Sequence, residues 1–143
     1  MDNQVLIYKY EAVYKALIPY FEHGIQAGFP SPGADYLENA IDLNEALIQN
    51  PSSTFIGRIK GTSMKDIGIF DNSLAIIDKS LSVKNGNMVV AFVDNGFTLK
   101  LIKMERNRVF LMPCNKDFEP ILMDESNEGM VWGRVTYIIN QAV

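Results

Sequence analysis

Hydrophobic positions in the second half of the chain fall in short runs separated by turn residues, a pattern typical of β-strands. The Asn95-Gly96 pair between two of these runs indicates a hairpin, because a type I′ turn needs positive φ at both central residues. We therefore expect a mainly β fold, a compact and mostly antiparallel body. The runs predict strands at residues 54–60, 74–78, 88–93, 97–103, 109–112 and 130–139.

The first part of the chain has a less regular pattern. Apolar residues within 6–18 fit one face of a helix, but the Tyr and Val content suits a strand equally well, so both remain open. Pro19 is expected to end either element. Residues 42–49 predict a short helix with Asp42 as its N-cap, and the following Asn-Pro pair stops it.

Residues 28–33, Gly-Phe-Pro-Ser-Pro-Gly, interrupt any regular element. Two prolines fix φ and remove backbone donors, and a glycine stands at each end. We expect an extended, accessible segment here. Such a stretch is usually a plain linker, although a bond that a protease cuts also needs an accessible, extended backbone.

Composition narrows the functional classes. A chain of 143 residues with 48% hydrophobic and 21% charged residues fits one soluble domain plus an arm. A net charge of −4 without a basic cluster disfavours direct binding to duplex DNA. One cysteine, Cys114, excludes an internal disulfide, and we expect neither a metal site nor a cofactor. With no signal peptide or bilayer-spanning run, we expect a cytoplasmic protein away from membranes.

Candidate chemistry centres on Ser63, which stands in the glycine-flanked stretch 61–70. A serine hydroxyl needs a neighbouring base, and the one histidine, His23, lies far upstream; we regard it, like the cysteine, as structural. Lys100 stands in the apolar run 97–102, and serine with lysine is a known variant of the catalytic triad. Alternation places apolar residues on both faces of that run, and burial there would favour the neutral, basic amine.

Each of these two residues alone has a plainer explanation, a turn serine and an exposed lysine on an edge strand. Their combination with the upstream segment Ala-Gly-Phe-Pro-Ser-Pro at 27–32 resembles the LexA/UmuD family of self-cleaving proteins, and its UmuD branch most closely. Ser63 follows Ala27 by 36 residues and precedes Lys100 by 37, and the resemblance runs from about residue 24 to the C-terminus. Type I signal peptidases, another serine-lysine group, are disfavoured because they are normally held in the membrane.

The resemblance implies a fold like the C-terminal domain of LexA and signal peptidase, and a self-cleaving serine endopeptidase. Ser63, activated by neutral Lys100, would cut the bond between Ala27 and Gly28. That cut would separate an N-terminal arm, residues 1–27, from a serine-lysine peptidase-like domain, residues 28–143.

Residues around the serine complete the expected site. Backbone N–H groups of Thr62 and Ser63 are the expected donors to the oxyanion. Met64 is expected to form a wall of the site. Thr62 stands where many UmuD relatives carry an acidic residue, which affects tuning of the site more than its chemistry.

The resemblance also implies a role in the SOS response to DNA damage. The RecA filament on single-stranded DNA would stimulate cleavage. The trimmed form would then pair as a homodimer and join a UmuC-type Y-family polymerase in translesion synthesis and SOS mutagenesis. Two alternatives stay open: a non-catalytic interaction module with the same fold, and a LexA-like regulator, which the absence of a helix-turn-helix in the first 27 residues disfavours.

Overall fold

The computed structural model describes residues 3–11, 17–21, 37–62, 64–113, 119–124 and 131–142. They divide into two compact units, one formed by Met1–Tyr10 with Asn50–Val143 and the other by Glu11–Gln49. The proline-rich segment 28–33, His23 and Cys114 lie outside the described residues.

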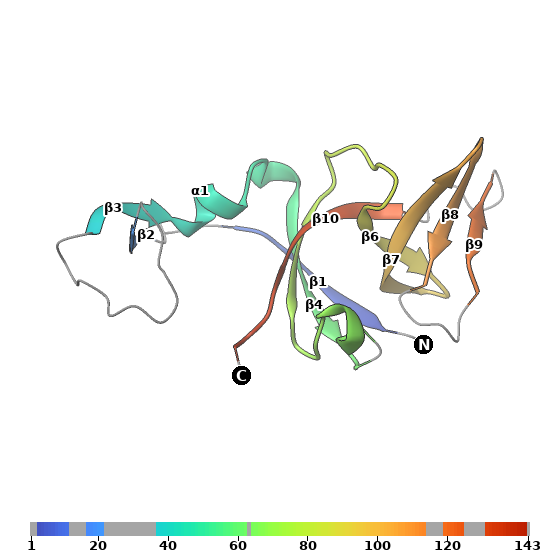
Figure 1. Cartoon of the computed structure of the whole chain (residues 1–143), viewed down its shortest axis with the longest axis horizontal. Coiled ribbons are helices and arrows are strands. Elements are labelled where there is room, and N and C mark those ends of the chain that lie inside the picture. The colour runs from blue at the N-terminus through green and yellow to red at the C-terminus, as the bar shows by residue number, and fades with distance from the viewer. Residues whose placement is uncertain are drawn as a thin grey trace. The chain divides into compact units, whose positions relative to one another are not determined.

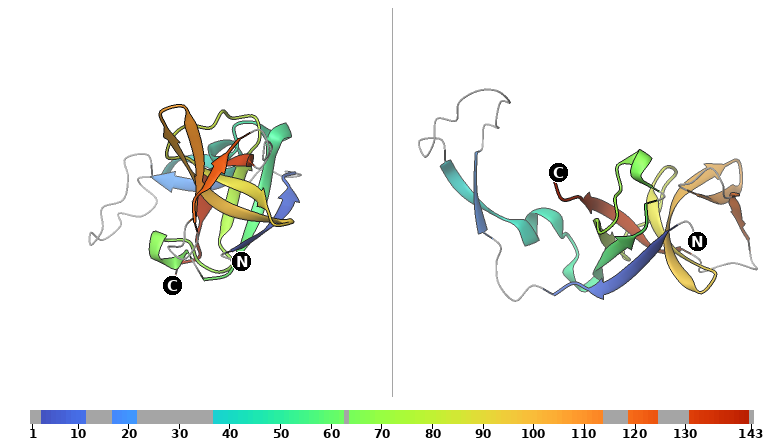
Figure 2. Two further views of the ribbon diagram at one scale, coloured as in Figure 1. Left: turned by 90° about the vertical axis from the view of Figure 1, so that its right-hand side faces the viewer. Right: turned by 90° about the horizontal axis from the view of Figure 1, so that it is seen from below.

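The larger unit is an eight-stranded antiparallel sheet that curls on itself (Figures 1 and 2). Its strand order is β1-β4-β5-β10-β6-β7-β8-β9. The predicted mainly β, antiparallel body is therefore confirmed. The strands are β1 (Gln4–Lys9), β4 (Thr54–Lys60), β5 (Leu74–Asp78), β6 (Met88–Val93), β7 (Gly96–Glu105), β8 (Arg108–Met112), β9 (Ile121–Met123) and β10 (Val131–Ile139).

Strands β4, β5 and β6 have the predicted bounds at both ends. In each, a short apolar run stops at turn residues on either side, so local sequence decides both ends. Strand β7 extends two residues beyond the predicted 97–103 because Met104 and Glu105 pair with β8. Met130, the predicted first residue of the last strand, lies outside the described residues.

The β6–β7 hairpin is present, but its turn lies one residue earlier than predicted. Val93 pairs with Gly96, so the two central residues are Asp94 and Asn95, with φ of 52° and 63°. Both are residue types that tolerate positive φ, which a type I′ turn requires. Gly96 therefore belongs to the ladder, and the assignment of the turn to Asn95 and Gly96 was wrong.

The smaller unit contains β2 (Leu17–Phe21), β3 (Leu37–Asp42) and α1 (Leu43–Leu47). The two strands pair antiparallel, so the choice between helix and strand for the N-terminal part resolves as strand, in β1 and β2. Pro19 does not end the element as predicted but pairs with Ala40. A two-stranded ribbon consists of edge strands, where a proline without a donor is tolerated.

The predicted N-cap of α1 is confirmed. The Asp42 carboxylate accepts a hydrogen bond from the Asn44 N–H at 3.0 Å, which satisfies one of the free donors at the helix start. The helix ends at Leu47, two residues before the predicted end at residue 49.

Two hydrophobic clusters form the core of the larger unit. Successive residues of β6 contribute to different clusters, because side chains alternate across a strand. An aromatic group adjoins the first cluster: the Trp132 ring lies 4.9 Å from the Phe55 ring and 5.3 Å from the Phe97 ring. The first cluster contains Val5, Ile59, Met64, Ile69, Ala75, Ile77, Val90 and Leu99, and the second Val89, Ala91, Ile102 and Leu111.

Candidate active site

Lys100 lies in β7, where it pairs with Val89 of β6, and only 6% of it is exposed. The alternation predicted for this run is confirmed: Leu99 belongs to the first hydrophobic cluster and Ile102 to the second. The Lys100 side chain is therefore almost completely buried within the sheet.

The turn after β4 contains the candidate nucleophile, Ser63, which lies outside the described residues. On one side of it, Gly61 has a φ of 109°, a conformation that glycine adopts without strain, and Thr62 is exposed. On the other side, Met64 is buried and precedes the short 3₁₀ helix Lys65–Ile67. The serine thus stands between an exposed and a fully buried residue.

Residues next to Ser63 and Lys100 in sequence pack in one cluster. Met64 follows the serine, Leu99 precedes the lysine, and both belong to the first hydrophobic cluster. Burial of these two side chains together brings two distant parts of the chain to the same region of the core. The expected role of Met64 as a wall of the site stays a prediction.

The expected scissile bond joins Ala27 and Gly28, which lie outside the described residues. In the chain they fall within residues 22–36, which connect the paired strands β2 and β3. The division of the chain at this bond and the oxyanion donors, Thr62 and Ser63, remain predictions.

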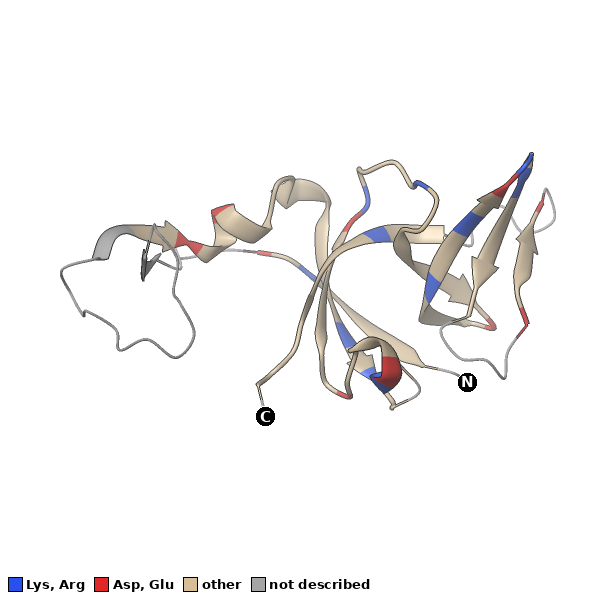
Figure 3. Ribbon diagram, in the orientation of Figure 1, with Lys and Arg blue, Asp and Glu red and all other residues tan. Residues whose placement is uncertain are grey.

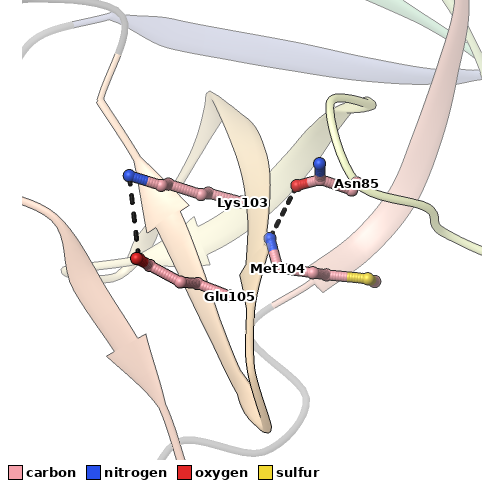
Figure 4. Close-up of polar contacts among 4 residues, drawn as sticks. All are labelled: Asn85, Lys103, Met104 and Glu105. Carbon is pink, nitrogen blue, oxygen red and sulfur yellow. Dashed lines mark hydrogen bonds and ion pairs between the residues drawn. The ribbon is translucent and has the colours of Figure 1, made fainter.

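Polar contacts support the strand that carries Lys100. The Met104 N–H donates to the Asn85 side-chain oxygen at 2.7 Å, and Lys103 lies 3.8 Å from Glu105 on the surface (Figure 4). Backbone hydrogen bonds between residues 86–87 and Ile102 continue the pairing beyond β6. Asn85 and Gly86 form a turn, and the contact of Asn85 with β7 was not visible in the sequence.

Asn3 is a residue near the candidate base that sequence reasoning missed. Only 4% of it is exposed, its side-chain oxygen accepts from the Leu99 N–H at 2.8 Å, and its amide nitrogen lies 3.5 Å from the Leu99 carbonyl oxygen. The contact joins residues 96 positions apart, so no local sequence pattern predicts it.

Charged side chains are interspersed over the described strands and turns rather than gathered in a stripe (Figure 3). The buried Asp78 stands apart from them at the end of β5. Burial alone would raise the pKa of its carboxyl, but hydrogen bonds from Ser80, Asn50 and Ser53 outweigh this effect and lower the pKa. This network ties the residues just before β4 to β5.

Within the described ranges, no group of three or more His, Cys, Asp or Glu is placed to hold a metal ion. No helix among those same residues has the length and apolar character that crossing a membrane requires.

The sequence profile of the family described as Peptidase S24-like matches residues 19–136, and the chain belongs to this family of self-cleaving serine peptidases. Protein MucA of Salmonella typhimurium and of Escherichia coli is 40% identical over 121 residues, 84% of this chain and 82% of the relative. Protein SamA of Salmonella typhimurium strain LT2 is 38% identical over 123 residues, 86% of this chain and 85% of the relative. The chain is thus a homologue of UmuD, a self-cleaving protein of SOS mutagenesis that joins a UmuC-type polymerase.

Proposed function

We propose that the chain cuts its own bond between Ala27 and Gly28 with Ser63 as nucleophile and Lys100 as base. The observation that carries this assignment is the burial of Lys100 in β7 beside Leu99, which packs in one cluster with Met64. The shared cluster supports the proposal that a buried amine and a glycine-flanked serine come together, as serine-lysine chemistry needs.

In the first step, the Ser63 hydroxyl oxygen bonds to the Ala27 carbonyl carbon while neutral Lys100 takes the hydroxyl proton. The carbon–nitrogen bond then breaks, Lys100 returns the proton to the Gly28 amine, and an ester joins Ala27 to Ser63. Water attacks this ester, giving a proton to Lys100, which passes it back to the serine oxygen. Backbone N–H groups of Thr62 and Ser63 are the proposed donors to the negatively charged oxygen.

The test of the dyad compares variants of the purified full chain from pH 6 to 10. Ser63→Ala, Lys100→Ala and Lys100→Arg should each abolish formation of the 28–143 fragment, because the two groups act as a unit and guanidinium does not deprotonate in this range. Wild-type cleavage should rise with pH, because only the neutral amine accepts a proton.

Lys103→Ala is the matched control, since Lys103 lies on the same strand but is about half exposed and pairs with Glu105 at the surface. It should cut at the wild-type rate. Normal cutting by Lys100→Arg, or a wild-type rate that does not change with pH, would remove lysine from the role of base.

The position of the cut has a separate test. A glutamate in place of Gly28 adds bulk and charge where the backbone must approach Ser63 closely, so Gly28→Glu should block cutting and leave the fold intact. Mass spectrometry of the products identifies the bond. If Gly28→Glu is cut at the normal rate, the bond lies elsewhere.

We further propose that the trimmed form works in the cytoplasm as a homodimer, that the RecA filament on single-stranded DNA stimulates the cut, and that the polymerase partner is of the Y family. The similarity to MucA and SamA over most of the chain supports these partners. The net charge of −4 supports contact with DNA through other proteins only. Salt-sensitive binding of the purified protein to plain duplex DNA, or a monomer in sedimentation at tens of micromolar, would contradict this part.

A further inference from the structure

The N-terminal strand β1 occupies the outer side of β4, the strand that leads to Ser63. All six residues of β1 pair with β4, from Gln4 opposite Lys60 to Lys9 opposite Phe55. The other side of β4 pairs with β5. Both edges of β4 are therefore paired with a neighbouring strand in the intact chain.

Val5, on the side of β1 that faces the core, is closely packed. Val5 is 2% exposed and belongs to the first hydrophobic cluster together with Met64 and Leu99. A β-carbon added at Gly57 would lie 2.7 Å from a methyl carbon of Val5, closer than side chains pack. A larger residue at Gly57 would thus fill the space that Val5 occupies.

The start of β1 contacts β7 at a point before the residues of β7 that pair with β8. The β7–β8 ladder begins at Leu101, and the backbone N–H and C=O of Leu99 instead face the side chain of Asn3. Strand β1 also lies against β7. It therefore lies between β4 and the part of β7 around Leu99, and the space that it occupies is called the β1 groove.

We propose that this groove is a binding site for an extended peptide strand, and that the excised segment, residues 1–27, stays bound there through β1 after self-cleavage. The inference rests on the cut proposed between Ala27 and Gly28. That bond lies 18 residues beyond Lys9, so cutting it breaks none of the contacts of β1. The groove recognises an extended strand with asparagine first and apolar residues at the third and fifth positions.

The cut changes how β1 is held rather than what it contacts. In the intact chain β1 binds as part of the same molecule, with an effective concentration on the order of millimolar. After the cut, retention depends on the affinity of the strand itself and on protein concentration. The outer side of β4 and the backbone of Leu99 become accessible only when the excised segment leaves. The family profile begins at residue 19, so β1 lies outside the matched residues.

The experiment makes the cut without the dyad. A recognition sequence for an added protease is inserted between residues 27 and 28 of the full chain that also carries Ser63→Ala. After cutting, native mass spectrometry and gel filtration at tens of micromolar should find the 1–27 segment bound to the 28–143 fragment. Hydrogen exchange should find the Leu99 N–H still protected. Separation of the two pieces at all concentrations up to about 100 μM would overturn the proposal.

Variants locate the retained contact. Asn3→Ala removes both hydrogen bonds to Leu99 without touching the hydrophobic cluster, and it should weaken retention about tenfold. Val5→Lys and Gly57→Ala should release the segment more completely. Tyr8→Lys is the matched control, because Tyr8 is 54% exposed on the same strand, and it should retain the segment as the wild type does.

Equal retention in Asn3→Ala, Val5→Lys and the Tyr8→Lys control would contradict binding through the inner face of β1. If Val5→Lys fails to fold, retention in Asn3→Ala compared with the Tyr8→Lys control still tests this mode of binding. The wild-type chain, with Ser63 intact and without the inserted sequence, tests the dyad alone. A wild-type chain that never shortens would refute the proposed function while the inserted-site result still reports on the groove.

Discussion

Replacing Asp78 by alanine should cause a large loss of stability, because the carboxylate holds three neighbouring residues. One oxygen accepts from the Ser80 N–H at 2.8 Å, the Ser80 hydroxyl at 2.6 Å and the Ser53 hydroxyl at 3.1 Å. The other accepts from the Asn50 amide at 2.7 Å. The site is only 3% exposed, so water cannot readily replace the lost acceptor.

The magnitude follows from these contacts. A hydrogen bond to a charged group contributes about 1.5–3 kcal/mol, and bonds within one network do not add fully. We therefore expect Asp78→Ala to lower the free energy of unfolding by about 3 kcal/mol, with a fall in Tm on the order of 10 °C. Urea unfolding followed by fluorescence of the single tryptophan, Trp132, measures the change. Asp71→Ala is the control, since Asp71 accepts one exposed bond from the Gly61 N–H and should cost less than about 1 kcal/mol.

The dependence on pH gives the reasoning a second test. The pKa of Asp78 is lowered in the folded chain, so the carboxylate stabilises the fold fully above its unfolded value of about 3.9. This contribution is lost as the pH falls through the folded pKa. The difference between wild type and Asp78→Ala should therefore be largest near pH 7 and narrow below about pH 4. A difference that stays constant from pH 7 to 3, or that widens, would refute the account.

Three further substitutions separate packing, backbone and aromatic effects. Gly133→Ala should destabilise by about 1–3 kcal/mol in urea unfolding, because the new β-carbon would lie 2.6 Å from a methyl carbon of Ile77. Gly68→Ala should cost about 1 kcal/mol in the same assay, because its φ is +83° but the space around it is open. Lys79→Gln should shift the emission of Trp132, because the ammonium lies 4.6 Å from the ring centre.

Local sequence predicted the strands whose apolar runs are bounded by turns, and it failed where pairing decides the structure. Strand β3 contains two acidic residues and an asparagine, and it becomes a strand because β2 lies beside it. Strand β9 has three residues, too few for a period to be visible, and exists through its pairing with β8.

The candidate site divides in the same way. The burial of Lys100 followed from alternation in one apolar run, which is a local property. The packing of Met64 with Leu99, and the contact of Asn3 with Leu99, depend on how a curled sheet brings distant strands together. The spacing of residues in the sequence does not predict these long-range contacts, because many strand orders are compatible with the same hydrophobic pattern.

The position of β10 also has a consequence for the order of folding. Strand β10 is the last in sequence, yet it pairs with β5 on one side and β6 on the other. The part of the sheet that leads to Ser63 and the part that holds Lys100 are thus joined by a strand that follows both of them in sequence. Pairing over such a separation is slow to form. A chain in which β10 has not yet paired therefore lacks a continuous sheet between β5 and β6, and the proposed dyad should form only after this strand has docked.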